Sequence, residues 1–489
     1  MGKPGVGWAA RLAVVVPVGV ALVAGVWGIG RGSLWQDEAT TLALAGRPLP
    51  QLWDTLGTVD AVHGVYYLLV HVLLGVAGAG PSPEVLLRVP SLLATAGAAL
   101  GVAVVGRRLG SPAAGLFAGT AYALAPVVVY HAQEARSFAL VAAAVVLACY
   151  LLVRAAEQPR RLRWWAGYAA AVALACLLNL FAAFFLLAHA VTLAACRVGF
   201  AVLWRWAVAC LAGLLCAAPV GWIAYGQQDQ VSHLDVPTWA TAGALVTRFA
   251  GGGVLLAVTG VLAGLAVLHR ADRAGPVGLP LLALPLAVLP PAALLLISQA
   301  HPFYADRYVL YSMLGLSWLI GAGAAAGARL PRLPAVAGVL PVALVAGLGL
   351  PAQEQVRRID SRPDDPAAAA RLVGQGARPG DVVLFLPSVR RLVAEAYPVE
   401  FRHARDAALK LSGPASGTLA GRELPPEDIV ASIGDAPRIW TVSRSHAADA
   451  DLSSSRDRAK RDLLRDDYRQ VRVTRVLGYA VRLYERGDG

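Results

Sequence analysis

Long runs of apolar residues recur along the first 350 residues of this 489-residue chain. Each run holds about 20 residues with almost no charge, the length of an α-helix that crosses ~30 Å of hydrocarbon. A mean hydropathy of +0.58, with 57% hydrophobic and only 15% charged residues, lies outside the range of soluble domains. The first part of the chain therefore requires a membrane, and the runs stop after residue 350.

Short Lys and Arg clusters between the runs predict how the chain crosses the membrane. Such clusters stay in the cytoplasm, so the two runs between consecutive clusters form hairpins that cross outward and return. The formal charge of +12 thus comes largely from clusters that orient the spans, and a nucleic-acid partner is not expected. The first run is long and lacks a small-residue cleavage site, which predicts a retained span with a cytoplasmic N-terminus. About eleven spans are expected, at 9–30, 86–105, 112–130, 136–153, 164–178, 180–196, 206–226, 251–268, 277–298, 308–327 and 333–350.

The predicted fold class is an all-α polytopic membrane domain followed by a small α/β extracytoplasmic domain. The boundaries are 1–350 for the membrane domain, with a long external loop at 31–86, and 351–489 for the second domain. Within the loop, the apolar stretch 63–78 is too short to span and would misplace Arg107 and Arg108, so we expect a helix lying in the membrane interface. The second domain is predicted from strand-like runs at 381–386 and 438–442 and a charged helix at 456–469.

Unusual polar residues gather in three external connections of this predicted topology. Ionisable groups at a membrane surface are costly enough to mark function. Asp37 and Glu38 follow the first span, and the sequence allows either a solvated pair at a helix end or catalytic carboxylates. Transfer of a glycosyl group needs one carboxylate to take the acceptor proton, and a phosphate leaving group needs no general acid.

The other two connections carry the arginines Arg136 and Arg307. They either snorkel to the interface or hold a lipid phosphate bidentately. The acidic residues beside them, Glu134 and Asp306, are either ion-pair partners or contacts to sugar hydroxyls. Tyr304 belongs to the same group of candidate donor or substrate contacts.

Three further residues have two open interpretations. His63 and His131 are either structural histidines or site residues, and Arg88 is either a topology anchor or a donor contact. No metal site is predicted, because His63, His131, Glu134 and His301 lack metal-ligand spacing, and all five cysteines lie in or beside apolar runs. No cofactor is expected, and the need for a divalent cation stays open.

These motifs resemble the polytopic C-superfamily glycosyltransferases that use polyprenyl-phosphate sugars, in the group of protein O-mannosyltransferases and lipid A aminoarabinose transferases. The resemblance covers residues 34 to 228, with a weaker echo at 306–308. It rests on an Asp-Glu pair in the first external loop, a His-Pro-Pro-Leu-Tyr-like run, an Arg-x-Pro-Ser start to the second span, and a Gln-x-x-Arg-x-Tyr/Phe-x-Leu tip. Here these read Asp37-Glu38, His63-Gly64-Val65-Tyr66-Tyr67, Arg88-Val89-Pro90-Ser91 and Gln133 to Leu140. The glycine and valine replace two prolines that are frequent in the family.

The resemblance implies a bacterial plasma-membrane enzyme that moves a sugar from a polyprenyl-phosphate donor to a glycan, lipid or protein hydroxyl outside the cell. It implies Asp37 as the base and Arg136 and Arg307 as donor-phosphate contacts, and mannose is the first sugar expected by analogy. A transporter or lipid-linked-sugar flippase is the alternative, and it would place charges near the bilayer midplane. A catalytically inactive scaffold is the second alternative.

Overall fold

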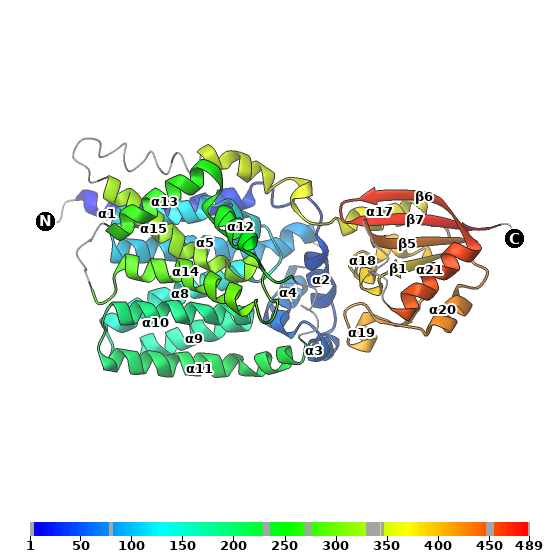
Figure 1. Ribbon diagram of the computed structural model, residues 1–489, viewed down its shortest axis with the longest axis horizontal. Coiled ribbons are helices and arrows are strands. Elements are labelled where there is room, and N and C mark those ends of the chain that lie inside the picture. The colour runs from blue at the N-terminus through cyan, green and yellow to red at the C-terminus, as the bar shows by residue number, and fades with distance from the viewer. Residues whose placement is uncertain are drawn as a thin grey trace. The chain divides into compact units, whose positions relative to one another are not determined.

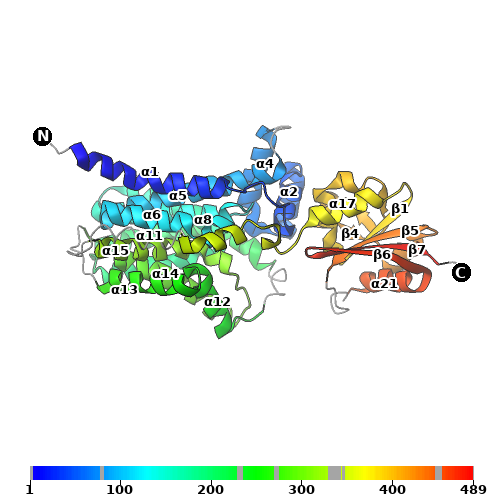
Figure 2. The same ribbon diagram turned by 90° about the horizontal axis from the view of Figure 1, so that it is seen from above.

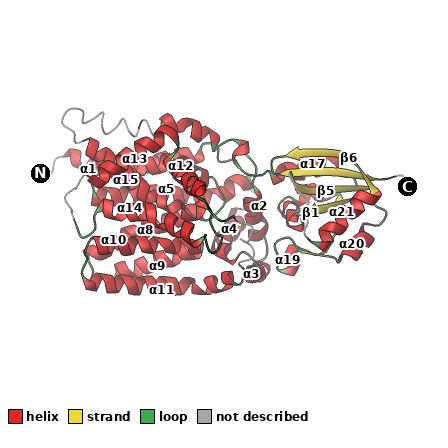
Figure 3. Ribbon diagram, in the orientation of Figure 1, coloured by secondary structure: helices red, strands yellow, loops and turns green. Residues whose placement is uncertain are grey.

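The computed structural model describes residues 4–77, 82–227, 235–268, 275–328, 343, 347–445 and 454–487. The chain divides into two compact units. The first, called the helical unit, comprises residues 1–29 and 88–357. The second, called the α/β unit, comprises residues 30–87 and 358–489. Strands occur in the α/β unit within the part of the chain described (Figure 3).

The helical unit consists of apolar helices packed side by side (Figures 1 and 2). Its helices are α1 (Pro4–Val26), α5 (Pro83–Leu109, from residue 88), α6 (Pro112–Leu124), α7 (Pro126–Ala132), α8 (Phe138–Glu157), α9 (Leu162–Leu178), α10 (Phe185–Ala195), α11 (Phe200–Tyr225), α12 (Trp239–Ala250), α13 (Gly253–Leu268), α14 (Leu279–Ile297) and α15 (Met313–Gly327), with 3-10 turns η2 (Leu180–Phe184) and η4 (Asp306–Ser312). Residues 347–355 are also helical.

Ten of the predicted spans each coincide with an apolar helix or helix pair, which confirms the all-α class of this part of the chain. Among the described residues, five helices are long and apolar enough to cross a bilayer, or up to seven if each of two bent pairs is one span. The predicted number of about eleven therefore stays a prediction. Most of the last predicted span, 333–350, lies outside the described residues.

Two of the spans are bent where the local sequence interrupts a helix. Between α6 and α7 the axis turns by 63° at Ala125, which is extended because it precedes Pro126. Between α12 and α13 it turns by 80°, and Gly251, Gly252 and Gly253 all have positive φ there. Helix α12 lies in a stretch that the sequence analysis treated as a connection, so that interpretation was incomplete.

Small residues allow the helices of this unit to approach closely. On α15, a Cβ added at Gly321 would collide with the backbone of α6 at Ala114. One added at Gly323 would collide with the backbone carbonyl of Leu262 on α13. The contact between α6, α13 and α15 is otherwise filled by buried Ala, Leu and Ile side chains.

The α/β unit combines the first long loop with the C-terminal part of the chain. The loop forms α2 (Gln36–Ala45), α3 (Leu49–Thr58), η1 (Ala61–His63) and α4 (Gly64–Ala77). The C-terminal part forms η5 (Ile359–Ser361), α17 (Pro366–Gly376), β1 (Asp381–Leu386), η6 (Ser388–Arg391), α18 (Leu392–Ala396), η7 (Pro398–Phe401), β2 (Ala404–Asp406), β3 (Leu409–Leu411), α19 (Gly413–Ser416), β4 (Arg422–Glu423), α20 (Pro426–Ile433), β5 (Arg438–Arg444), α21 (Ser455–Asp467), β6 (Tyr468–Val476) and β7 (Tyr479–Arg486).

A five-stranded sheet forms the centre of the C-terminal part, in the order β2-β1-β5-β7-β6. Strands β2, β1 and β5 are parallel; β7 pairs antiparallel with β5, and β6 pairs antiparallel with β7 at the edge of the sheet. All six residues of β1 are buried, as a continuous apolar run in a parallel sheet requires. One face packs on α17 and α18 and the other on α20 and α21. The predicted strands at 381–386 and 438–442 and the predicted helix at 456–469 are confirmed, and with them the α/β class.

The glycine contacts predict how two matched substitutions change stability. Gly323→Ala puts a methyl group where the Leu262 carbonyl stands, so α13 and α15 must separate, and we expect a loss of about 1–3 kcal/mol. Gly260→Ala on α13 adds the same methyl group with no atom within 4 Å, so it should leave stability unchanged or raise it through helix propensity. Thermal unfolding of the two purified variants in detergent checks this. Equal midpoints would contradict the close approach of α13 and α15.

Candidate active site

The acidic pair of the first loop begins α2, and its two members differ in their surroundings. The Glu38 side chain is fully buried, and its Oε2 atom accepts a hydrogen bond from the backbone nitrogen of Trp35 at 3.3 Å. This bond closes the start of the helix, where acidic side chains also favour the positive end of the helix dipole. Asp37 in the same turn is only partly buried. Glu38 thus has a structural role, and Asp37 is the more accessible carboxylate.

The first turn of α2 contacts residues from the C-terminal part of the α/β unit. The backbone nitrogen of Gln36 donates to Asp364 Oδ1 at 2.7 Å, and Arg390 donates to the Gln36 side chain. Just before the helix, Ser33 Oγ donates to Asp365 Oδ1 at 2.5 Å. Burial is the main reason that the pKa of Asp364 is raised to about 6; the hydrogen bond from Gln36 and the charge of Arg390 oppose the rise, and the charges of Asp37 and Asp365 add to it. None of these C-terminal partners was predicted from the sequence.

The other end of α2 is held by the buried Arg47. Its guanidinium pairs with Glu395 at 2.7 Å and donates to the carbonyl groups of Thr418 and Leu419 at 2.8 and 3.0 Å. His63, in the turn before α4, is buried, and its Nε2 lies 4.0 Å from an oxygen of Asp60. The structure therefore places His63 in the same unit as Asp37, inside the fold of the loop.

In the helical unit, the end of α7 and the turn that follows it carry three of the predicted site residues. His131 Nδ1 lies 2.5 Å from Glu134 Oε2, and both side chains are buried. Arg136 is buried as well, and its carbonyl accepts a hydrogen bond from Ser91 Oγ at 3.0 Å. Glu134 thus has His131 as a hydrogen-bond partner, and its role as ion-pair partner or sugar contact stays a prediction.

The last connection, between α14 and η4, approaches the same turn. The Arg307 guanidinium lies 5.7 Å from the centre of the Phe138 ring and 5.9 Å from that of Tyr308, a cation–π arrangement. Phe138 follows Arg136 by two residues, so the two predicted phosphate-binding arginines lie on neighbouring segments. Burial raises the pKa of Tyr304 to about 12, and the nearby Asp306 charge contributes.

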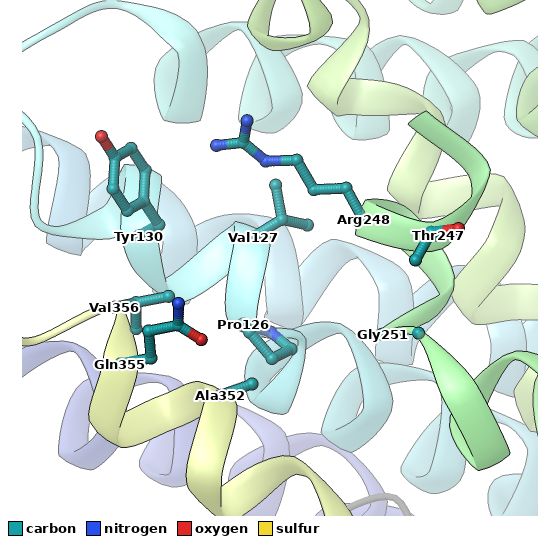
Figure 4. Close-up of a pocket in the computed structure, with 10 residues that line it drawn as sticks. Pro126, Val127, Tyr130, Thr247, Arg248, Gly251, Ala352, Gln355 and Val356 are labelled. Atoms are coloured by element: carbon teal, nitrogen blue, oxygen red, sulfur yellow. The ribbon is translucent and has the colours of Figure 1, made fainter. Parts of the chain in front are cut away.

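Asp306 pairs with an arginine that the sequence analysis missed. Its Oδ2 lies 2.5 Å from Nη1 of Arg248 on α12, and the Arg248 side chain is 47% exposed. Figure 4 shows that this side chain extends toward Tyr130, whose ring centre is 5.7 Å from the guanidinium carbon. The only available signal in the sequence was a lone arginine in a predicted external connection.

A pocket of about 320 Å³ lies beside the contact between Arg248 and Tyr130. It is lined by Pro126, Val127, Tyr130, Thr247, Arg248, Gly251, Gly252, Ala352, Gln355 and Val356.

Arg88 contacts the end of α1. Its Nη1 donates to the carbonyl group of Ile29 at 2.8 Å. Gln133 donates to the carbonyl groups of Gly25 and Trp27, both at 2.8 Å. These contacts give Arg88 a partner at the end of α1, and its role as topology anchor or donor contact stays a prediction. They also give the glutamine of the 133–140 motif a structural role.

The described residues contain no group of three or more His, Cys, Asp or Glu side chains that could hold a metal ion. The expectation of no cofactor, with a divalent cation left open, stays a prediction.

Comparison with known proteins agrees with the fold. Residues 75–223 match the family model described as dolichyl-phosphate-mannose-protein mannosyltransferase. ArnT from Cupriavidus metallidurans in the apo state superposes with a TM-score of 0.61 at 14% identity, and the same protein bound to undecaprenyl phosphate with 0.59 at 15%. Each match covers 98% of both chains. No curated protein matches the chain by sequence. Over 98% of its length the chain has the fold of ArnT, and together with the match of residues 75–223 this confirms the predicted resemblance. The apolar helices support a multi-pass membrane protein.

The raised pKa of Asp364 predicts a pH-dependent effect on stability. An ordinary aspartate has a pKa near 3.8, so between about pH 4 and 6 the folded chain binds a proton that the unfolded chain does not. Asp364 therefore stabilises the folded chain while its carboxyl group is protonated at low pH. This stabilisation is lost as pH rises through about 6 and the buried carboxyl group ionises. We expect Asp364→Asn to melt at a higher temperature than the wild type at pH 8, and we expect this difference to shrink steadily between pH 6 and pH 4 and to vanish below about pH 4. A pH-independent difference between the two melting temperatures would contradict this.

Proposed function

We propose that the chain transfers a sugar from a polyprenyl-phosphate donor to an acceptor hydroxyl outside the cytoplasm. The observation that carries the proposal is the match of residues 75–223 to the mannosyltransferase family model, on a chain with the C-superfamily fold throughout. The solved complex of ArnT with undecaprenyl phosphate supports a polyprenyl phosphate as the donor lipid. The family model supports mannose as the first sugar to test. The N-terminus would be cytoplasmic, and the α/β unit extracytoplasmic.

In the proposed reaction, Asp37 takes the proton of the acceptor hydroxyl. The acceptor oxygen forms a bond to C1 of the sugar while the bond from C1 to the phosphate oxygen breaks, and the polyprenyl phosphate leaves with the electron pair. Attack from the face opposite the leaving group inverts the configuration at C1. The partial exposure of Asp37, compared with the fully buried and hydrogen-bonded Glu38, supports Asp37 as the base.

The leaving phosphate needs positive charge, which we assign to Arg136 and Arg307. A planar guanidinium can bind two phosphate oxygens at once, and it does so more strongly where water is largely excluded. Arg136 is buried, and Arg307 lies over the aromatic rings of Phe138 and Tyr308. The burial of Arg136 and the aromatic rings beside Arg307 support a phosphate site that is positively charged and poorly hydrated.

The acidic pair allows a matched test of the base. Asp37→Asn keeps the shape of the side chain and removes its basicity, so transfer of label from polyprenyl-phosphate mannose should fall by about 10²–10⁴-fold while donor binding stays unchanged. Glu38→Gln removes the neighbouring charge but keeps an oxygen acceptor for the Trp35 nitrogen, so it should fold normally and retain most of the turnover. An active Asp37→Asn enzyme would refute the assignment of the base.

The arginines are tested by donor binding in the purified protein. Arg136→Gln and Arg307→Gln each remove a charge-assisted pair of hydrogen bonds, so the affinity for undecaprenyl phosphate should fall by about 10- to 100-fold. Arg108→Gln is the control, because Arg108 pairs with Glu157 at 2.5 Å within a predicted cytoplasmic cluster. Similar affinity in all three variants would show that these two arginines do not hold the phosphate.

A further inference from the structure

The helix that carries Asp37 depends on the C-terminal part of the chain for its orientation. Helix α2 has only ten residues, and isolated helices of that length are marginal in water. Its first turn is bound by Asp364 and Arg390, and Arg47, two residues after its end, pairs with Glu395. All of these residues belong to the α/β unit.

The contact to Asp364 satisfies a group that the helix leaves unpaired. Gln36 is the first residue of α2, so its backbone nitrogen has no acceptor within the helix. Asp364 Oδ1 accepts this hydrogen bond at 2.7 Å, and the adjacent Arg390 donates to the Gln36 side chain. Both the main chain and the side chain of Gln36 are thus fixed by residues more than 300 positions away in the sequence.

The immediate neighbour of Gln36 is the proposed base. Asp37 lies close enough to Asp364 for its charge to raise the pKa of that carboxyl. The other charged and titratable groups around Asp364 are Arg390, Asp365 and Tyr479, whose ring lies 5.1 Å from the Arg390 guanidinium carbon. Arg390 compensates part of the negative charge, so the cluster can hold two carboxylates beside the base.

We infer that Asp364 is a positioning residue for sugar transfer: together with Arg390 it fixes the first turn of α2 and thereby the direction in which Asp37 faces the acceptor. The inference rests on the proposed function of Asp37 as base. The C-terminal part of the chain then contributes to catalysis by fixing the orientation of α2. A base that is displaced by about 1 Å loses on the order of 10² in rate, so this contact bears on turnover.

The first test follows the amide hydrogen of Gln36 by residue-resolved hydrogen exchange, in the full-length protein in lipid nanodiscs. Asp364→Ala removes the acceptor, so exchange at Gln36 should accelerate at least tenfold. Asp364→Asn retains an oxygen acceptor and should keep most of the protection. Asp381→Ala is the matched control, because Asp381 is a buried carboxylate of the same unit that accepts the backbone nitrogen of Arg378 at 3.0 Å. Unchanged exchange at Gln36 in Asp364→Ala would overturn the inference whatever the substrate is.

The second test measures transfer from polyprenyl-phosphate mannose. Asp364→Ala and Arg390→Gln should lower kcat by 10- to 100-fold with an unchanged KM for the donor, Asp364→Asn should restore most of kcat, and Asp381→Ala should retain wild-type kcat. A wild-type kcat in Asp364→Ala, with Asp37→Asn inactive, would overturn this inference and leave the proposed function standing. An Asp37→Asn enzyme with wild-type activity would overturn the proposed base, and the exchange result would still decide whether Asp364 fixes the turn.

Discussion

The carbonyl groups at the end of α1 are the point on which the helical unit depends. A helix end leaves four carbonyl groups without partners, and an unpaired carbonyl inside a membrane protein costs several kcal/mol. Here side chains from three distant segments supply the donors: Arg88 in α5, Gln133 before α8, and Arg357. One helix end thus determines where three parts of the chain meet. The turn that carries Arg136 is among them.

A comparable dependence holds in the α/β unit, where the interaction lies at the start of α2. Asp37 and Glu38 are adjacent in the sequence, yet the backbone directs one into the fold and leaves the other partly exposed. Glu38 contributes to the helix start, which is a local effect of its position three residues after Trp35. The contacts from Asp364 and Arg390 are not local, and they connect the first loop to the C-terminal part of the chain.

The site residues that were missed share a physical property. Arg248, Asp364 and Arg390 belong to no recognisable motif, so their chemistry becomes visible only with their partners. Arg248 pairs with Asp306 across 58 positions, and Asp364 binds Gln36 across 328. Glu134 illustrates the opposite case, because its partner His131 is three residues away, and the sequence still left its role open.

Hydrophobic pattern alone was sufficient to predict the membrane class, the position of most helices and the strands β1 and β5, because burial in lipid or in a sheet requires contiguous apolar residues. The acidic pair, the two arginines and the superfamily resemblance also came from local sequence. Only the tertiary structure decided that the first loop packs with the C-terminal sheet, that Arg88 and Gln133 hold the end of α1, and that Asp364 binds the first turn of α2. These contacts join groups that are far apart in the sequence, and the energy that selects them comes from pairing polar groups as the chain becomes compact.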